Sequence, residues 1–453
     1  MTTEELDWKE CVAQAVKSGD LGDVMTATAT MDRALCSSGS GALEAEDRQI
    51  VIDLVKNEKA ASPLRQHAIK ALTHARDGSE ETVKLVAGCF SAKTPGEAAA
   101  EASKYFLSLS TDGVCAFSKV SETIRAVADA SGEAALRIVE CVLAGLKGEC
   151  ATAWRKDATA MYCLGLLPKM LESSDIVIVL NAAELLDDTE KWNDEEIDAE
   201  AQIPAVSRLA ASTSGFGLVR VGAIRALGGI AARGPKSFDA SIRAGIFAQL
   251  QKLMAQEEGE EDIAIAAMTA LSHAVSTAGV NGIRSILDRH PDFIDTLLLT
   301  EEKPWAGNMT HLMLTHAAAH ILCSPGRDSA DGSNLLKTAL FEKLRPNPTS
   351  VINDSVKMAC SSQEDRSRAG THFLTSLSFH SWGVDALLLN TAFTGMLLVR
   401  DYPFFTRSER FLIAKNLLHF HPEYEQSHPE LGLLVSKGPS YLPSTPIVKS
   451  DHS

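Results

Sequence analysis

The sequence predicts an all-α protein built as a helical solenoid, and two observations carry that prediction. Hydrophobic residues make up 45% of the 453 residues but aromatic residues only 6%, a composition rich in the small and straight-chain residues that favour helices over strands. In addition, one short helical pattern recurs along the chain, with a small residue at its fifth place and an apolar residue at its ninth. Degenerate repetition of this kind is typical of solenoids, in which stacked units bury apolar faces that no single unit can bury.

The repeated pattern occupies residues 64–72 and 219–227, and more loosely residues 263–271. Four small residues that anchor such helices lie 44 to 52 residues apart: Ala223, Ala267, Ala317 and Ala369. This spacing is close to the HEAT and armadillo period of about 40–47 residues. We therefore expect a HEAT/armadillo-like, right-handed superhelical solenoid of stacked helix pairs over residues 1–442, followed by a flexible tail at 443–453.

Turn and capping residues divide the chain into short helices. Ser62-Pro63 predicts a helix start, with Ser62 as the cap and proline in the first turn. Thr94-Pro95-Gly96-Glu97 repeats the device with an acidic residue in the first turn. Helix ends or corners are expected at three further places: Gly132, Gly234-Pro235 and His290-Pro291.

Two acidic segments interrupt the helical rhythm, at residues 187–200 and 257–262. Both are expected between helices, either as solvated loops or as docking loops for a basic partner. In the second case Trp192 is an exposed anchor of the kind that dominates binding energy, and the acidic side chains beside it would contact the partner: Asp194, Glu195 and Glu196.

Three arginines occupy the second place of repeat-like helices: Arg65, Arg155 and Arg220. Equivalent positions in a solenoid fall on one surface. These side chains therefore either bond neighbouring loops within the stack or form a row that meets a partner. Arg220 is included among the candidate partner-binding residues on the second interpretation.

Charge and cysteine usage limit the class of protein. A formal net charge of -16 argues against a nucleic-acid partner. The apolar stretch at residues 176–186 is too short to cross a membrane. Nine cysteines without a C-x-x-C pair, behind an opening that has no apolar signal, predict buried thiols in a reducing cytoplasmic or nuclear compartment.

Catalytic motifs are nearly absent from the sequence. It has no G-x-x-x-x-G-K-[ST] and no H-E-x-x-H. The best metal-like group is His316 and His320, four apart on one helix, with His311 and Cys323 nearby; these side chains are either zinc ligands or structural histidines. We expect no enzyme activity, no catalytic residues and no cofactor or metal.

The C-terminal region carries the most specific pattern. A helix at Thr371–Leu377 leads into the corner His380–Gly383, a helix with Phe393 ends in Arg400-Asp401, and the chain closes with Lys437–Leu442. This order resembles the 26S proteasome non-ATPase regulatory subunit 5 family. The residues that match are Trp382, Arg400, Asp401, Gly438, Pro439 and Tyr441.

The resemblance implies a chaperone. Members of that family are HEAT- or armadillo-like superhelices that bind the C-terminal domain of an ATPase subunit of the proteasome base. They hold it while the regulatory particle assembles and leave before the mature particle forms. The resemblance implies that partner for this chain, and we expect a monomer that binds neither nucleic acid nor membrane. Trp382 and Tyr441 either close the C-terminal end of the solenoid or touch the partner.

A generic scaffold or peptide-binding adaptor is the alternative function. Importin-like readers carry a Trp-x-x-x-Asn ladder along the inner groove. Trp382 is followed four residues later by Ala386, and Trp154 by Ala158. Neither pair fits that ladder, which favours the chaperone over the peptide reader.

Overall fold

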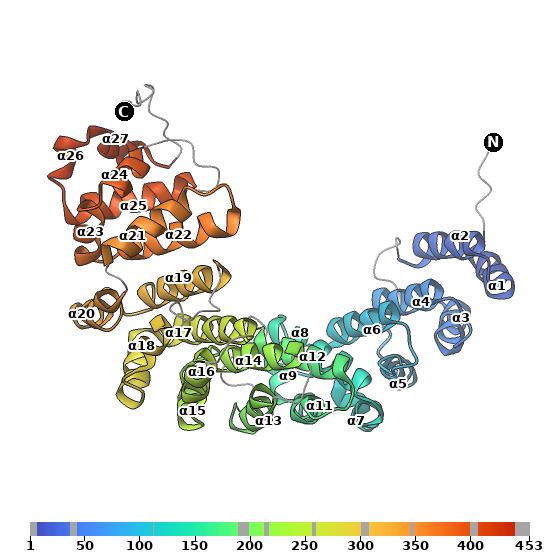
Figure 1. Ribbon diagram of the computed structural model, residues 1–453. Helices are drawn as coiled ribbons and strands as arrows, with labels where there is room; N and C mark the ends of the chain where they lie inside the picture. The colour runs from blue at the N-terminus through green and yellow to red at the C-terminus, as the bar shows by residue number, and fades with distance from the viewer. Residues whose placement is uncertain are drawn as a thin grey trace. The chain divides into compact units, whose positions relative to one another are not determined.

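A computed structural model describes residues 7–36, 43–111, 113–188, 199–212, 217–255, 260–299, 308–344, 348–398 and 406–439. These residues are helical almost throughout (Figure 1) and contain no β-strand; Thr111 and Val114 form a single isolated bridge. The helices stack on their neighbours along the chain, so the protein is an all-α repeat solenoid, as the sequence predicted.

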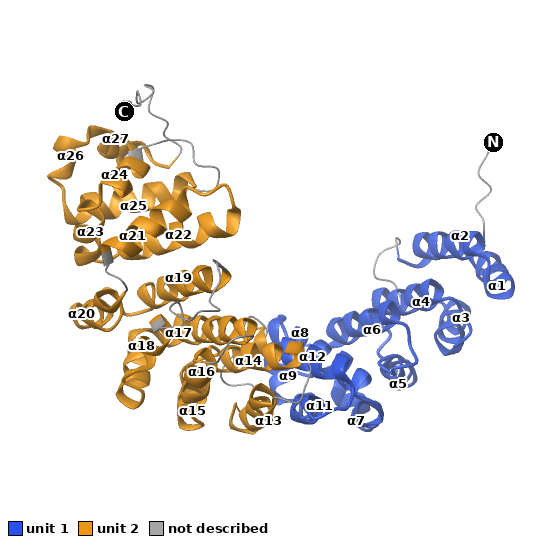
Figure 2. Cartoon of the chain, viewed as in Figure 1, with its two compact units in different colours: residues 1–185, 190–192 blue, residues 186–189, 193–453 orange. Residues whose placement is uncertain are grey.

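The chain divides into two compact units (Figure 2). Unit 1 comprises residues 1–185 and 190–192, and unit 2 comprises residues 186–189 and 193–453. The boundaries between the units lie between residues 185 and 193, so they overlap the start of the first acidic segment, residues 187–200. Whether one continuous solenoid spans residues 1–442 stays a prediction, and the expected tail at 443–453 lies outside the described residues.

Unit 1 is a stack of short helices around an apolar core. In order, its helices are α1 (Trp8–Ser18), α2 (Leu21–Met31), the π-helical turn η1 (Asp32–Cys36), α3 (Ala45–Lys56), α4 (Ser62–Ala75), α5 (Glu80–Gly88), α6 (Gly96–Leu109), the 3-10 turn η2 (Ala116–Val120), α7 (Ser121–Ala130), α8 (Gly132–Lys147), α9 (Ala151–Lys156), α10 (Ala158–Leu164) and α11 (Leu167–Leu171). Helix α12 (Ile176–Asp187) follows and reaches the division between the units. Fully buried rings fill the middle of unit 1: Phe90, Tyr105, Phe106, Phe117 and Trp154.

Unit 2 continues the same construction. Its helices are α13 (Ala199–Ala211), α14 (Gly217–Ala231), α15 (Pro235–Arg243), α16 (Ile246–Met254), α17 (Glu261–Arg289), α18 (Phe293–Leu299), α19 (Asn308–Leu322), α20 (Ala330–Ala339), the 3-10 turn η5 (Phe341–Lys343), α21 (Pro348–Ala359), α22 (Glu364–Ser378), α23 (Ser381–Leu388), α24 (Thr391–Leu398), α25 (Arg407–Phe420), α26 (Tyr424–Ser427) and α27 (Pro429–Lys437). Four of these, α14, α17, α19 and α22, pack on one another in succession. We call these four helices the ladder.

The repeated sequence pattern becomes the contact surface between stacked helices. Its three copies lie in α4, α14 and α17, and the residues at the fifth and ninth places are at most 1% exposed in every copy: Ala68, Leu72, Ala223, Leu227, Ala267 and Leu271. The anchors Ala317 and Ala369 are also completely buried, in α19 and α22. A small side chain lets the next helix approach closely, and the larger residue one turn away fills the space that remains.

The ladder helices run parallel. In α14 and α17, Arg220 bonds Glu260 at one level while Gly228 lies against Ala270 about two turns further on. Between α17 and α19, Thr310 donates to Glu261 over 2.6 Å at the first turns, and further along the N–H of Val280 donates to the backbone oxygen of Pro325 over 2.8 Å. The same direction holds between α19 and α22, where residues 320 and 323 meet residues 372 and 376. Equivalent turns of successive helices therefore lie side by side.

Helix ends follow the predicted turn residues with two corrections at the caps. α6 begins at Gly96 with Glu97 in its first turn, but its cap position is Pro95 and not Thr94. α8 begins at Gly132, and α17 ends just before His290. Ser62, however, is the first residue of α4, and Ala61 is the cap. Proline in the first turn tolerates the helix start without a side-chain cap, because its missing N–H is one that would have lacked a partner.

Helix α17 is long and apolar enough to cross a membrane by length and composition alone. Two features show that it is a core element. Gly279 has φ of 66°, so the segment consists of two helices joined at a kink. In addition, 67% of its most apolar stretch is buried inside the protein. Apolar character on every side is expected of a helix packed between neighbours.

The close approach of α14 to α17 gives a direct test of the stacking. A Cβ added at Gly228 would lie 2.3 Å from the Cα of Ala270. We expect Gly228→Ala to lower the free energy of unfolding by about 1–3 kcal/mol, because the backbones must separate. Gly217→Ala, in the first turn of the same helix, adds a Cβ that meets nothing within 4 Å, so its effect should stay within about 0.5 kcal/mol. Urea unfolding followed by circular dichroism measures both, and equal effects would contradict the close packing.

Candidate interaction surface

The uncovered side of the ladder exposes apolar side chains. Leu218 in α14 is 73% exposed and Met309 in α19 is 51% exposed. Val221, Ile265 and Met313 are half-buried at the next turn of α14, α17 and α19. Because almost every other apolar residue of these helices is buried, the exposed ones mark a side that none of the described helices covers. We call this side, with these five residues, the ladder face.

Histidines gather at the other end of the ladder face. His316 and His320 are one turn apart on α19, and their rings lie 6.0 Å and 4.9 Å from that of His372 on α22, measured between centroids. Burial lowers the pKa of all three and brings that of His372 to about 4, so the imidazoles are neutral at pH 7.

The geometry does not favour zinc at these histidines. Among the described residues, no group of three or more His, Cys, Asp or Glu side chains is placed to hold a metal ion. The thiol of Cys323 lies 3.0 Å from the hydroxyl of Ser376 and is engaged there. The structure thus brings His372 to the predicted pair, and the result is a half-buried neutral cluster.

Arg220 is buried within unit 2. Its side chain is 9% exposed; Nε donates to the backbone oxygen of Ala210 over 3.1 Å, and Nη1 donates to Glu260 over 2.6 Å. These contacts are the ones expected if the arginine bonds neighbouring loops within the stack. Arg65 is buried as well, whereas Arg155 is exposed, so the three arginines do not share one environment. Contact of Arg220 with a partner stays a prediction.

The acidic candidates fall largely outside the described residues. Trp192, Asp194, Glu195 and Glu196 all lie there. Of the second acidic segment, Glu260 accepts the Arg220 bond and Glu261 the bond from Thr310, so both carboxylates connect elements of unit 2. Glu261 and Asp262 belong to the first turn of α17 and not to a loop. Asp262 is exposed beside the ladder face.

Trp382 is fixed at a corner of unit 2. Its indole N–H donates to Ser333 over 3.0 Å, and its ring stacks on His380 with centroids 4.7 Å apart. His380 in turn bonds Ser333 through Nδ1 and the backbone oxygen of Leu322 through Nε2. The chain of bonds joins α19, α20 and α23, as expected if Trp382 closes this part of the solenoid.

The remaining C-terminal residues are only partly described. Gly438 ends α27 with φ of 85°, a positive φ that glycine adopts without strain, and Pro439 follows it. Arg400, Asp401 and Tyr441 lie outside the described residues. The described residues therefore do not test whether the residues of the C-terminal pattern lie close together.

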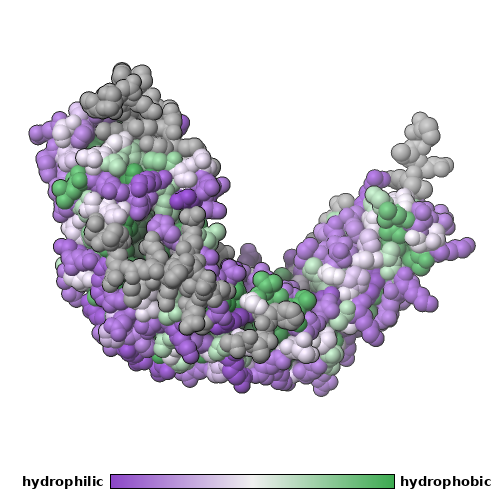
Figure 3. All heavy atoms as spheres, in the orientation of Figure 1, coloured by the Kyte–Doolittle hydropathy of each residue, from purple (hydrophilic) through white to green (hydrophobic). Residues whose placement is uncertain are grey.

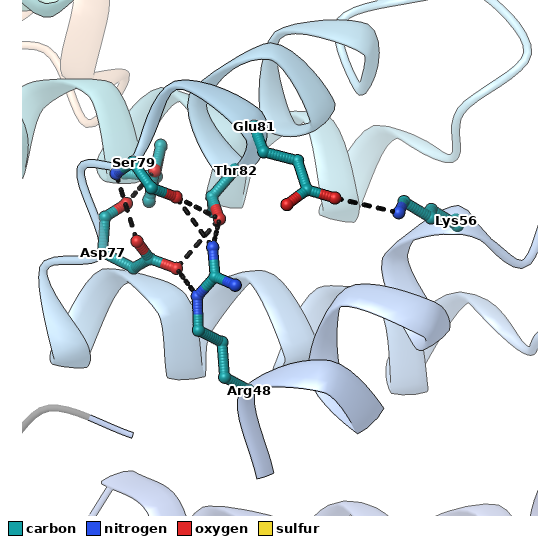
Figure 4. Close-up of polar contacts among 7 residues, drawn as sticks. Arg48, Lys56, Asp77, Ser79, Glu81 and Thr82 are labelled. Atoms are coloured by element: carbon teal, nitrogen blue, oxygen red, sulfur yellow. Dashed lines mark hydrogen bonds and ion pairs between the residues drawn. The ribbon is translucent and has the colours of Figure 1, made fainter. Parts of the chain in front are cut away.

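Unit 1 contains a polar network that sequence reasoning missed (Figure 4). Arg48 of α3 donates to Asp77 over 2.6 Å, to Ser79 over 2.7 Å and to Thr82 over 2.8 Å. Burial by itself raises the pKa of Asp77, but hydrogen bonds from Ser79, Thr82 and Arg48 outweigh it and lower that pKa overall. The partners are 29 to 34 residues apart in sequence. The network ties α3 to the turn between α4 and α5.

A second apolar patch lies on α2 of unit 1. Leu21 is 70% exposed and Met25 64% exposed, one turn apart on the same side. Figure 3 shows hydrophobic side chains gathered over this helix. A separate groove of about 570 Å³, lined mainly by small residues, lies between the α5–α6 turn and α7. The groove is lined by Lys93, Glu122 and Thr123 as well as by small residues.

No family model matches the chain, and no curated protein matches it. Among solved structures, Kap121p bound to Pho4p is 14% identical over 96% of this chain, with a TM-score of 0.48, and the match spans 46% of Kap121p. A designed armadillo repeat protein is 16% identical over 56% of this chain and 99% of its own, with a TM-score of 0.39. Another, in complex with the peptide (KR)4, is 15% identical over 56% of this chain and 93% of its own, at 0.36. These neighbours are armadillo/HEAT-like repeat proteins, and none of them is the proteasome subunit of the resemblance, which stays a prediction.

Proposed function

We propose that this protein is a non-catalytic scaffold that binds another protein. The observation that carries the proposal is the ladder face, where Leu218 and Met309 stay exposed on helices whose other apolar residues are buried. Exposed apolar side chains grouped on one rigid surface are characteristic of protein interaction sites. The half-buried histidines and the buried Arg65 and Arg220 pack within the stack, and none of them forms a pair of nucleophile and base beside a cavity.

The more specific proposal is that the scaffold is an assembly chaperone. On the C-terminal resemblance, its partner is the C-terminal domain of an ATPase subunit of the proteasome base, held until the regulatory particle is complete. A net charge of -16 suits a partner with a basic surface and speeds their encounter. A repeat protein suits this role because its long surface can match a folded domain without any reactive group. A cytoplasmic or nuclear location follows from this role.

Affinity purification of the full chain, followed by mass spectrometry, tests the specific proposal. We expect one ATPase subunit of the base to be enriched, with core-particle subunits absent. Size-exclusion chromatography of the chain mixed with the purified C-terminal domain of that subunit should then give a one-to-one complex. Recovery of whole mature proteasomes, or of no base ATPase, would contradict the chaperone role. In that case the proposal of a generic scaffold remains and is tested separately below.

A further inference from the structure

The ladder face has an order that identifies a kind of partner. Leu218 of α14 and Met309 of α19 lie at the same height along the ladder, on either side of the first turn of α17. This follows because Arg220 contacts Glu260 and Thr310 contacts Glu261. One turn further on, Val221, Ile265 and Met313 fall within about 3–6 Å of the same level at 1.5 Å per residue, counted from these contacts and from the contact of Gly228 with Ala270. The five side chains therefore form an apolar strip that crosses three adjacent helices.

Carboxylates accompany the apolar strip. Asp262 is exposed in the first turn of α17, and Asp365 is exposed in the first turn of α22 near His316. Asp187 lies 3.5 Å from His273, on the α17 side of the histidines. Two arginines, Arg225 and Arg368, are also exposed, and Arg368 is paired with Glu364 over 2.5 Å. The border of the strip is thus acidic on balance.

Three histidines beyond the strip are uncharged at neutral pH, whereas a hydrogen bond to Asp187 raises the pKa of His273 beside them. His316, His320 and His372 are half-buried and neutral, so they add aromatic surface and no positive charge that would repel a basic partner. Methionine is the most adaptable apolar side chain and recurs at surfaces that accept helices. With neighbouring helices 8–10 Å apart, three of them span about 20–30 Å, the length of a helix of about 14–20 residues.

From this arrangement we infer that the ladder face docks an amphipathic helix of a partner protein, with an apolar side on the strip and a lysine- or arginine-rich flank towards the carboxylates. The inference rests on the proposed scaffold function and adds the partner's chemistry. An acidic flank would meet Asp262 and Asp365 and be repelled. An extended peptide would not cover the strip with one continuous side, because its side chains alternate in direction.

A pair of synthetic peptides tests the inference with the full-length protein. Each peptide is a labelled helix of about 18 residues with leucines at i, i+3, i+4 and i+7. One peptide carries lysines on both flanks of the leucine side, and the other carries glutamates at the same positions. Fluorescence anisotropy should show the lysine peptide binding at least about tenfold more tightly than the glutamate peptide at low salt. Equal binding of the two peptides, or binding of neither, would overturn the inference.

Single substitutions locate the binding. Met309→Lys and Leu218→Lys should each weaken the lysine peptide by about tenfold, and Asp262→Lys should reduce its advantage over the glutamate peptide. Leu389→Lys is the matched control, since Leu389 is 86% exposed at the end of α23, away from the strip. Circular dichroism confirms that each variant is folded. An equal loss in the control would overturn the assignment.

The outcome separates this inference from the chaperone proposal. If the ATPase subunit is recovered equally by wild type and by Met309→Lys, the docking site is wrong while the chaperone role stands. If peptide binding follows the expected order but no ATPase is recovered, the docking site stands and the chaperone role is wrong.

Discussion

Replacing Trp154 with alanine is expected to lower the free energy of unfolding by about 3–5 kcal/mol, the cost measured for large aromatic residues in protein cores. Trp154 is 1% exposed and lies 4.9 Å from Phe117, between ring centroids. Phe117 contacts Phe106 at 5.0 Å, so the indole ends a row of buried rings. Its other side rests on the backbone of α8, where a Cβ at Gly145 would come within 2.4 Å of the ring.

The loss should be concentrated in unit 1. Each repeat of a solenoid depends mainly on its neighbours, so a cavity beside α8 weakens the helices around it first. Urea unfolding followed by circular dichroism measures the free energy, and hydrogen exchange should show faster exchange in residues 121–164. Val177→Ala is the control, because Val177 is 63% exposed in α12; its effect should stay within about 0.5 kcal/mol. A Trp154→Ala protein as stable as the control would contradict the packing described here.

The fold class and the helix contacts could be predicted because they rest on local pattern. A small residue followed four places later by a large apolar one is visible in the sequence, and the buried pairs Ala68 with Leu72 and Ala223 with Leu227 are where the pattern placed them. The burial of Trp154 could not be predicted from a short sequence motif. The search for a Trp-x-x-x-Asn ladder excluded one role for this residue, but its burial depends on Phe117 and Gly145, which no short motif includes.

The candidate surface could be predicted only in part. Leu218 and Met309 look like core residues in the sequence, since both lie in apolar helical segments; their exposure depends on whether another helix covers that side. Hydrogen bonds between residues far apart in the sequence could not be predicted either. Arg48 and Asp77 are 29 residues apart, and Trp382 and Ser333 are 49 apart. The predicted acidic anchor at Trp192 lies outside the described residues and stays a prediction.

Acidification from pH 7 to pH 5 is expected to destabilise unit 2 through the histidines whose pKa is lowered by burial. Burial, reinforced by His320 and His316, lowers the pKa of His372 to about 4, and burial also lowers the pKa of His316, His320 and His380. An unfolded histidine has a pKa of about 6.5. Above that value neither state binds the proton. Below it the unfolded chain binds protons that the folded protein does not, so stability falls as the pH falls and the loss is complete below about pH 4.

The size of the loss follows from the shift of His372. At about 1.4 kcal/mol per pH unit, this residue alone contributes a loss of about 3 kcal/mol, of which about 2 kcal/mol falls between pH 7 and pH 5. Urea midpoints measured across this range should therefore decrease, and His372→Gln should make the decrease smaller because glutamine does not titrate.

His421 supplies a control of opposite sign. Its ring bonds Glu423 and Asp385 at 2.8 Å each, and these carboxylates raise its pKa. A raised pKa gives stability that is present below pH 6.5 and is lost as the pH rises through the folded value. In His421→Gln the acid loss should therefore be larger than in wild type, whereas in His372→Gln it is smaller. If both substitutions changed the pH dependence in the same direction, the difference between a desolvated neutral histidine and an ion-paired one would not hold for this protein, and the neutral histidines inferred for the ladder face would lose their basis.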